Sequence, residues 1–166
     1  GKGEGALFLQ YANAKVTNCT FEENEATNLG NIRCIDYVHL ELSKSRFLNN
    51  FFKRGAGVAF AFLEPNTSVI NIDSNEFIDN EASIKGGALY GRHTDYITVK
   101  ITNNIFINNK APLGGAISFQ DEVTRAEIEG CEFYGNTASN GGAFSSEQID
   151  IVVEFKDCIF NGNSAS

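Results

Sequence analysis

The residues that could carry acid–base chemistry in this chain are its carboxylates and its two histidines. The richest polar run is Gly91-Arg92-His93-Thr94-Asp95-Tyr96, in which His93 stands close to an acid. A general base oriented by an aspartate needs a nucleophile or a metal beside it. The sequence places neither there, so this run is interpreted as a solvated loop between strands. His39 occupies an alternate position in a strand pattern and is expected at the surface.

Carboxylates could also act in clusters, as they do in polysaccharide lyases and hydrolases, often with calcium or a basic side chain. In a repetitive chain such a cluster would arise from acids at equivalent positions of adjacent units. Glu76 and Glu132 share a repeat position, but the unit between them has Ile105 there. No acidic column is evident, and we therefore predict no catalytic residue, no metal site and no cofactor.

The four cysteines could form disulfides or bind a metal. Cys19, Cys131 and Cys158 share one repeat position, two residues before a Phe. This position predicts a small, buried side chain that stacks from unit to unit. A disulfide between Cys131 and Cys158 is the alternative, since stacked strands lie about 4.8 Å apart. No Cys/His spacing matches a zinc site. In the other units the position holds Ser45, Asn75 and Asn104.

Two Asn-x-Ser/Thr sequons could accept an N-linked glycan. Asn66 lies in the longest insertion, 61–68, beside Pro65, and this insertion should project as a loop. Asn18 stands at a strand turn, next to a cysteine assigned to the core. Asn66 is therefore the better glycosylation candidate, and Asn18 is the second.

All these residues belong to a sequence repeat, and its pattern predicts the strands and turns that position them. A Phe is followed three residues later by an Asn six times, at Phe spacings of 26, 30, 29, 27 and 27 residues. A period of this size predicts a solenoid. The pairs are Phe21/Asn24, Phe47/Asn50, Phe77/Asn80, Phe106/Asn109, Phe133/Asn136 and Phe160/Asn163.

Within each unit, apolar and polar residues alternate, as in Val99-Lys100-Ile101. Alternation predicts short strands with one buried face, and recurring Gly pairs predict sharp bends. Parallel stacking in register would bring identical positions together. The Phe rings should then form one internal ladder and the Asn amides another. We predict an all-β parallel β-helix of about six coils with roughly three short strands each, at residues 3–28, 29–54, 55–85, 86–113, 114–140 and 141–166.

These paired elements resemble the polymorphic outer membrane protein repeat of chlamydial (Pmp-type) surface autotransporters, which joins Gly-Gly-Ala-(Ile/Leu/Val) to Phe-x-x-Asn. The resemblance implies a right-handed, single-stranded parallel β-helix of the pectin-lyase-like type. It also implies secretion or cell-surface exposure and a role in adhesion or surface architecture. The first three Gly elements are imperfect. The clearest pairs of the two motifs are at 86–89 with 106–109, 114–117 with 133–136, and 141–144 with 160–163.

The charge and the composition of the chain narrow the range of functions that it could have. The net charge of −8 disfavours nucleic acid and anionic membrane surfaces as partners, and no apolar run approaches the ~20 residues of a membrane span. The leading hypothesis is a non-enzymatic structural or adhesive segment, extracellular or at the cell surface, that displays loops to a protein or glycan. The alternative is a carbohydrate-binding or polysaccharide-degrading β-helix.

A third hypothesis is a scaffold coil that packs against neighbouring subunits of a larger assembly. The repeat pattern runs to both ends of residues 1–166, and uncapped solenoid edges favour association. We therefore expect a single β-helix segment that belongs to a longer chain or is capped by partners.

Overall fold

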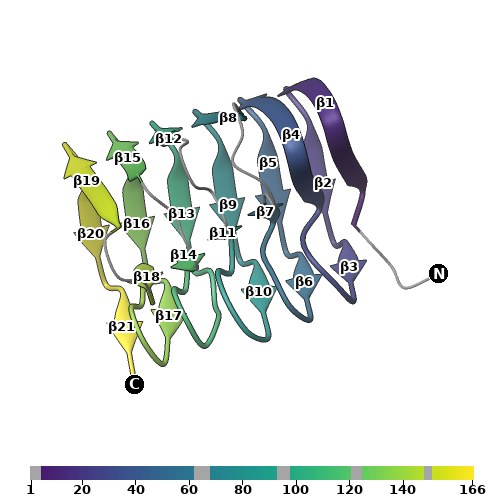
Figure 1. Ribbon diagram of the computed structural model, residues 1–166. Coiled ribbons are helices and arrows are strands. Elements are labelled where there is room, and N and C mark those ends of the chain that lie inside the picture. Colours follow the sequence, from purple (N-terminus) through teal and green to yellow (C-terminus); the bar gives the residue numbers. More distant parts are fainter. Residues whose placement is uncertain (1–4, 62–67, 93–97, 121–124, 148–150) are drawn as a thin grey trace.

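The computed structural model describes residues 5–61, 68–92, 98–120, 125–147 and 151–166. Throughout these ranges the regular elements are β-strands, and each strand pairs in parallel with the equivalent strand of an adjacent coil (Figure 1). The predicted all-β parallel solenoid is confirmed. In the described residues no helix is long and apolar enough to cross a membrane.

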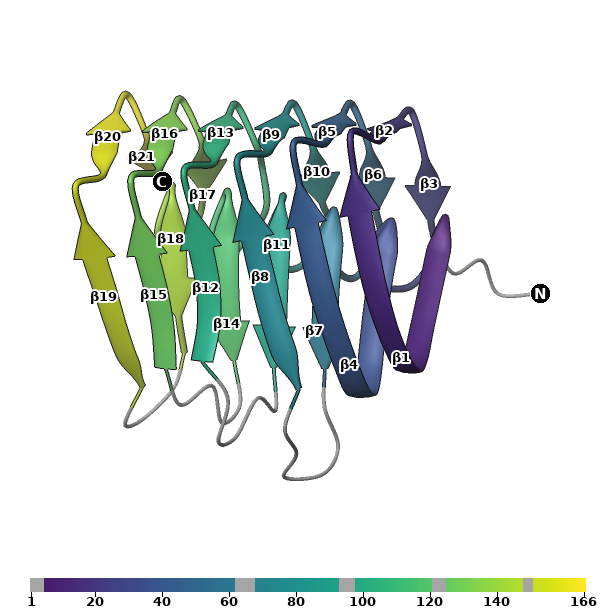
Figure 2. The same ribbon diagram turned by 90° about the horizontal axis from the view of Figure 1, so that it is seen from above.

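The largest sheet covers two sides of the rod. Its first two strands, β1 (Leu7–Thr17) and β4 (Ile32–Ser43), are long and bend midway (Figure 2). One half of β4 therefore pairs with β7 (Val58–Ala61) and the other half with β8 (Val69–Asp73). Tyr11 and Asp36, with φ of 51° and 59°, lie at these bends. The strands in sheet order are β18 (Phe144–Ser146), β14 (Ile117–Gln120), β11 (Leu89–Arg92), β7 (Val58–Ala61), β4 (Ile32–Ser43), β8 (Val69–Asp73), β12 (Thr98–Thr102), β15 (Arg125–Glu129) and β19 (Val152–Lys156), with β1 (Leu7–Thr17) beside β4.

Shorter strands build the remaining sides. A second sheet contains β2 (Thr20–Glu22), β5 (Arg46–Leu48), β9 (Glu76–Ile78), β13 (Ile105–Ile107), β16 (Glu132–Tyr134) and β20 (Ile159–Asn161). A third side carries β3 (Glu25–Ala26), β6 (Phe51–Phe52) and β10 (Glu81–Ala82), then β17 (Thr137–Ala138) and β21 (Ser164–Ala165). The first two coils thus have the predicted three strands, whereas later coils divide the long strand into two.

Two sharp turns in each coil use left-handed backbone. Their φ values lie between 50° and 67°, a region that costs a side chain about 1–2 kcal/mol and glycine almost nothing. Asn, Asp and Gly dominate these positions because they tolerate this conformation best. One turn column is Asn18, Lys44, Ser74, Asn103, Gly130 and Asp157, and the other is Glu23, Asn49, Asp79, Asn108, Gly135 and Gly162.

The Gly pairs make a third turn for two separate reasons. Gly86 needs a positive φ of 56°, and a Cβ on Gly87 would lie 2.3 Å from the carbonyl oxygen of Gly115 in the next coil. The first glycine therefore bends the chain, while the second lets adjacent backbones approach closely.

The core lies inside the coil. In β12, Val99 and Ile101 are buried while Lys100 between them is exposed, as the alternation predicts. Phe52, which replaces alanine in its column, is fully buried. It joins Ala26, Ala82 and Ala111 in a second small apolar cluster on the third side.

Candidate functional site

The repeated Phe residues form one continuous stack along the rod. Successive ring centroids lie 4.6 to 5.0 Å apart, with interplanar angles of 3° to 13°. Near-parallel rings at this spacing add about 0.5–1.5 kcal/mol per pair beyond burial. These residues hold coils in register and present no chemistry to the outside. The stack runs through Phe21, Phe47, Phe77, Phe106, Phe133 and Phe160.

The repeated Asn residues form a ladder of amides beside the stack. The Oδ1 of Asn80 accepts from the backbone N–H of Asn50 (3.2 Å) and from its Nδ2 (2.8 Å). The Nδ2 of Asn80 donates to the carbonyl of Phe47 and to Oδ1 of Asn109, both at 2.9 Å. The same contacts recur in the neighbouring coils, so these buried amides are satisfied within the ladder.

Asn136 shows that this ladder is not made of amides alone. Its side chain is fully buried. Oδ1 accepts from the backbone N–H of Asn109 (2.9 Å) as well as from its Nδ2 (3.0 Å). Nδ2 donates to the backbone carbonyl of Phe106 (2.9 Å) and to Oδ1 of Asn163 (2.8 Å). Half of the side-chain hydrogen bonds of Asn136 therefore join it to the backbone of the preceding coil.

The Phe stack and the Asn ladder are more exposed to solvent at the last coil than the sequence predicts. The ring of Phe160 is 49% exposed, and Asn163 is only partly buried. Both residues still contact the coil before them, through the ring of Phe133 (4.7 Å between centroids) and the amide of Asn136. Among the described residues, no coil follows to cover their other side.

A second polar ladder occupies the position shared by the cysteines. Oδ1 of Asn75 accepts from the backbone N–H of Ser45 (2.9 Å). The backbone N–H and the Nδ2 of Asn75 both donate to Oδ1 of Asn104 at 2.9 Å. The backbone of Asn104 then donates to Sγ of Cys131 at 3.5 Å. The sequence indicated only a small stackable side chain here. The missed signal is that Ser, Asn and Cys can all accept a hydrogen bond.

All four cysteines are free thiols, so Cys131 and Cys158 are not joined. Each thiol instead donates to a carbonyl of the preceding coil, Cys131 to Ile101 and Cys158 to Ile128, both at 3.4 Å. Burial raises the pKa of Cys131 to about 11. These thiols act as polar side chains of the ladder, Cys131 buried and Cys158 half-buried, rather than as partners of a bridge.

The other predicted positions lie on the surface or outside the described residues. Asn18 is exposed in a left-handed turn with φ of 58°, and its glycosylation remains a prediction. Asn66 lies outside the described residues. His39 is exposed in β4, and the run 91–96 is not wholly a loop, because Gly91 and Arg92 belong to β11. The rest of that run is outside the described ranges.

One acidic pair does occur in adjacent coils, contrary to the sequence-based expectation. Glu127 in β15 and Glu154 in β19 are register partners. Arg125 bridges them, since its Nε lies 3.0 Å from Glu127 and its Nη2 contacts Glu154. The hydrogen bond to Glu127, together with the charge of Glu154, raises the pKa of Arg125. This arrangement is a surface triad of one cation and two carboxylates.

Asp73 is the most extensively hydrogen-bonded carboxylate on this face. Oδ1 accepts from Thr102 at 2.6 Å and from Asn103 at 3.0 Å, and Oδ2 accepts from Ser74 at 3.0 Å. The Thr102 hydrogen bond, more than any other contact, lowers the pKa of Asp73. Asp73 is thus held ionised, which does not suit a general acid at neutral pH.

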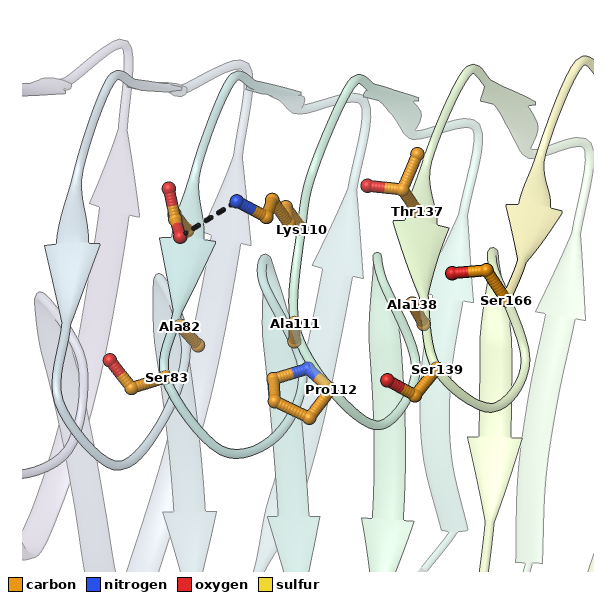
Figure 3. A pocket seen from close by; sticks show the side chains of 10 residues that line it. Ala82, Ser83, Lys110, Ala111, Pro112, Thr137, Ala138, Ser139 and Ser166 are labelled. Atoms are coloured by element: carbon orange, nitrogen blue, oxygen red, sulfur yellow. Dashed lines mark ion pairs between the residues drawn. The ribbon is translucent and has the colours of Figure 1, made fainter.

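A shallow groove of about 400 Å³ runs along the third side of the rod (Figure 3). Its floor consists of small side chains such as Ala82, Ala111 and Ala138, with Pro112 beside them. An ion pair between Lys110 and Glu81, 3.1 Å long, stands on its rim. The described lining contains no aromatic ring on which a sugar could stack, so this groove is a weak candidate for glycan binding.

A second groove, of about 530 Å³, is strongly basic and is the best candidate binding site. Arg33 enters it from β4 and Arg92 from β11, while Arg54 and Lys85 come from the turns that precede β7 and β11. We call this site the basic groove. No acidic residue is among its described lining residues. The sequence did not indicate it, because these four cations occupy different positions of the repeat.

No group of three or more potential metal ligands occurs in the part of the chain that the structure describes. The family model described as "Right handed beta helix region" matches residues 1–124, about three quarters of the chain. No curated protein and no solved structure matches it.

Proposed function

We propose that this chain, which belongs to the right-handed beta helix family, is a non-enzymatic structural or adhesive segment of a secreted or cell-surface protein. The observation that carries the proposal is the continuous Phe stack beside the Asn ladder. The most recurrent side chains stabilise a rod, and recognition is left to the residues that do not repeat. Kinship with Pmp-type surface repeats is part of the same proposal.

The ladders make the rod suited to display. Each interior Asn is hydrogen-bonded to the coils on both sides, so a single coil cannot slip without breaking contacts in two directions. On the outer face, oppositely charged residues lie next to one another in register, as in the Lys15–Glu41 pair (3.6 Å) and the Lys100–Glu127 pair (3.9 Å). Exposed pairs of this kind add little stability but keep the face soluble.

The proposal is tested by comparing adhesion with catalysis. Beads coated with the chain should bind to cells or to a glycan array, and beads coated with the heat-unfolded chain should not. In parallel, the chain should release no reducing ends and no unsaturated products from a panel of plant, bacterial and animal polysaccharides. Specific turnover of any polysaccharide would overturn the non-enzymatic assignment. Failure to bind in every adhesion format, with the chain folded, would overturn the adhesive role.

A further inference from the structure

We propose that the basic groove is an anion-binding site that recognises a tetrahedral oxyanion, a sulfate or phosphate group. The chain has 13 Lys and Arg against 21 Asp and Glu, yet four cations and no acid line this single concavity in the described residues. Cations that merely keep a surface soluble would be interspersed with acids, as they are on the face of β12 and β15. Lys85 is paired with Glu147 at the edge, but gathering the three arginines in one concavity costs free energy unless an anion relieves it.

Arg92 provides the strongest indication of a ligand. Its Nε is buried and has no hydrogen-bond partner among the described residues. A buried donor left unsatisfied is costly, so such atoms are usually paired with protein, water or ligand. The planar guanidinium fork fits a tetrahedral oxyanion with two parallel hydrogen bonds. Arg92 also lines the groove, so a turn of its guanidinium toward an oxyanion bound there would give Nε the acceptor that it lacks.

A hydrogen-bonded chain fixes one wall of the groove before any ligand arrives. The hydroxyl of Tyr90 donates to Oε1 of Gln120 at 3.2 Å, and Nε2 of Gln120 donates to Glu147 at 2.7 Å. Glu147 also pairs with Lys85 at 3.4 Å, which holds that ammonium at the edge of the groove. Gln120 is the register partner of Arg92 on the adjacent strand. Such preorganisation lowers the entropy cost of binding.

The opposite wall is held by a cation–π contact. The guanidinium carbon of Arg33 lies 5.6 Å from the centroid of the Phe8 ring. Arg54 is exposed and completes the rim. A groove of about 530 Å³ falls within the usual range of ligand sites and exceeds what one inorganic ion fills. The sulfate or phosphate group can therefore be free or can be carried on a molecule about the size of a sugar.

Titration calorimetry on the whole chain at low ionic strength tests this site. The probes are inorganic sulfate, inorganic phosphate, galactose 6-sulfate, glucose 6-phosphate and the two unmodified sugars. We expect the charged probes to bind, the unmodified sugars not to bind, and affinity to fall as salt is added. An ester that binds more tightly than its inorganic ion identifies a carried group as the ligand, and equal affinities identify the free anion.

The variant Arg92→Gln should weaken binding at least about tenfold, because it removes a charged hydrogen-bonding partner. Arg46→Gln is the matched control: Arg46 lies outside the groove, paired with Glu76 at 2.8 Å, and its loss should leave affinity unchanged. Thermal unfolding of each variant checks that it remains folded. The proposal is wrong if no charged probe binds the wild-type chain, or if Arg92→Gln and Arg46→Gln bind the probes equally well.

Discussion

Replacing Asn80 with alanine tests whether the amide ladder stabilises the rod. Asn80 is fully buried. Its side chain takes part in four hydrogen bonds, two accepted from Asn50 and two donated, to Phe47 and Asn109. At about 1 kcal/mol per hydrogen bond, Asn80→Ala should lower the free energy of unfolding by about 4 kcal/mol. That is a large part of the roughly 5–15 kcal/mol that typically separates folded from unfolded domains.

The matched control is the same change at Asn24. That side chain is only partly buried and donates one hydrogen bond, from Nδ2 to Oδ1 of Asn50 at 3.1 Å. Asn24→Ala should therefore cost about 1 kcal/mol. Both residues occupy the same turn of the repeat, so the comparison isolates the number of ladder contacts.

Urea titration followed by far-ultraviolet circular dichroism measures both variants. The slope of the free energy against urea must stay unchanged for the two values to be compared, because solenoids can unfold in parts. If Asn80→Ala costs no more than Asn24→Ala, the hydrogen bonds of the ladder contribute nothing net and the reasoning is refuted.

Three further predictions concern a ring of the stack, a surface carboxylate and a buried thiol. Phe77→Ala should cost about 3–5 kcal/mol in the same titration, whereas truncation of the half-exposed last ring of the stack should cost far less; equal costs would contradict the stacking argument. Hydrogen bonds led by that of Thr102 lower the pKa of Asp73. Its carboxylate therefore stabilises the fold above the unfolded pKa of about 3.9, and this stabilisation disappears as the pH falls through the lower folded value. The melting-temperature gap between wild type and Asp73→Asn should accordingly be wide at neutral pH and should narrow as the pH falls below about 3.9; a constant gap would refute this. Burial raises the pKa of the Cys34 thiol to about 12, so peptide mapping should find iodoacetamide on Cys34 only after denaturation and on the half-buried Cys158 in the native chain; native labelling of Cys34 would contradict its burial.

The sequence was sufficient for the fold because its strongest signal, a repeated Phe and Asn, reports positions that meet only when coils stack in parallel. The same periodicity predicted which residues of β8 and β12 point inward. It could not predict the bends at Tyr11 and Asp36, which join two strands into one in the first two coils. Those residues belong to no repeated motif.

The basic groove was beyond sequence reasoning for a related reason. Arg33 and Arg92 lie on strands in different coils and at different outward positions, while Arg54 and Lys85 lie in turns. Only the bending of the chain brings strand and turn side chains around one concavity. The Glu127–Glu154 pair differs, because its members are one repeat apart and a full register comparison could have found it.

The amide ladder has a direction. From Asn24 to Asn136, each side chain donates an Nδ2 proton to Oδ1 of the Asn in the next coil, always toward the C-terminus. The amide dipoles therefore add along the rod axis, and hydrogen bonds in such a chain polarise one another. The rod therefore has a net dipole along its axis, and its two ends differ electrically. Any further coil, whether from the same chain or from a partner, can extend this ladder in one orientation only, head to tail.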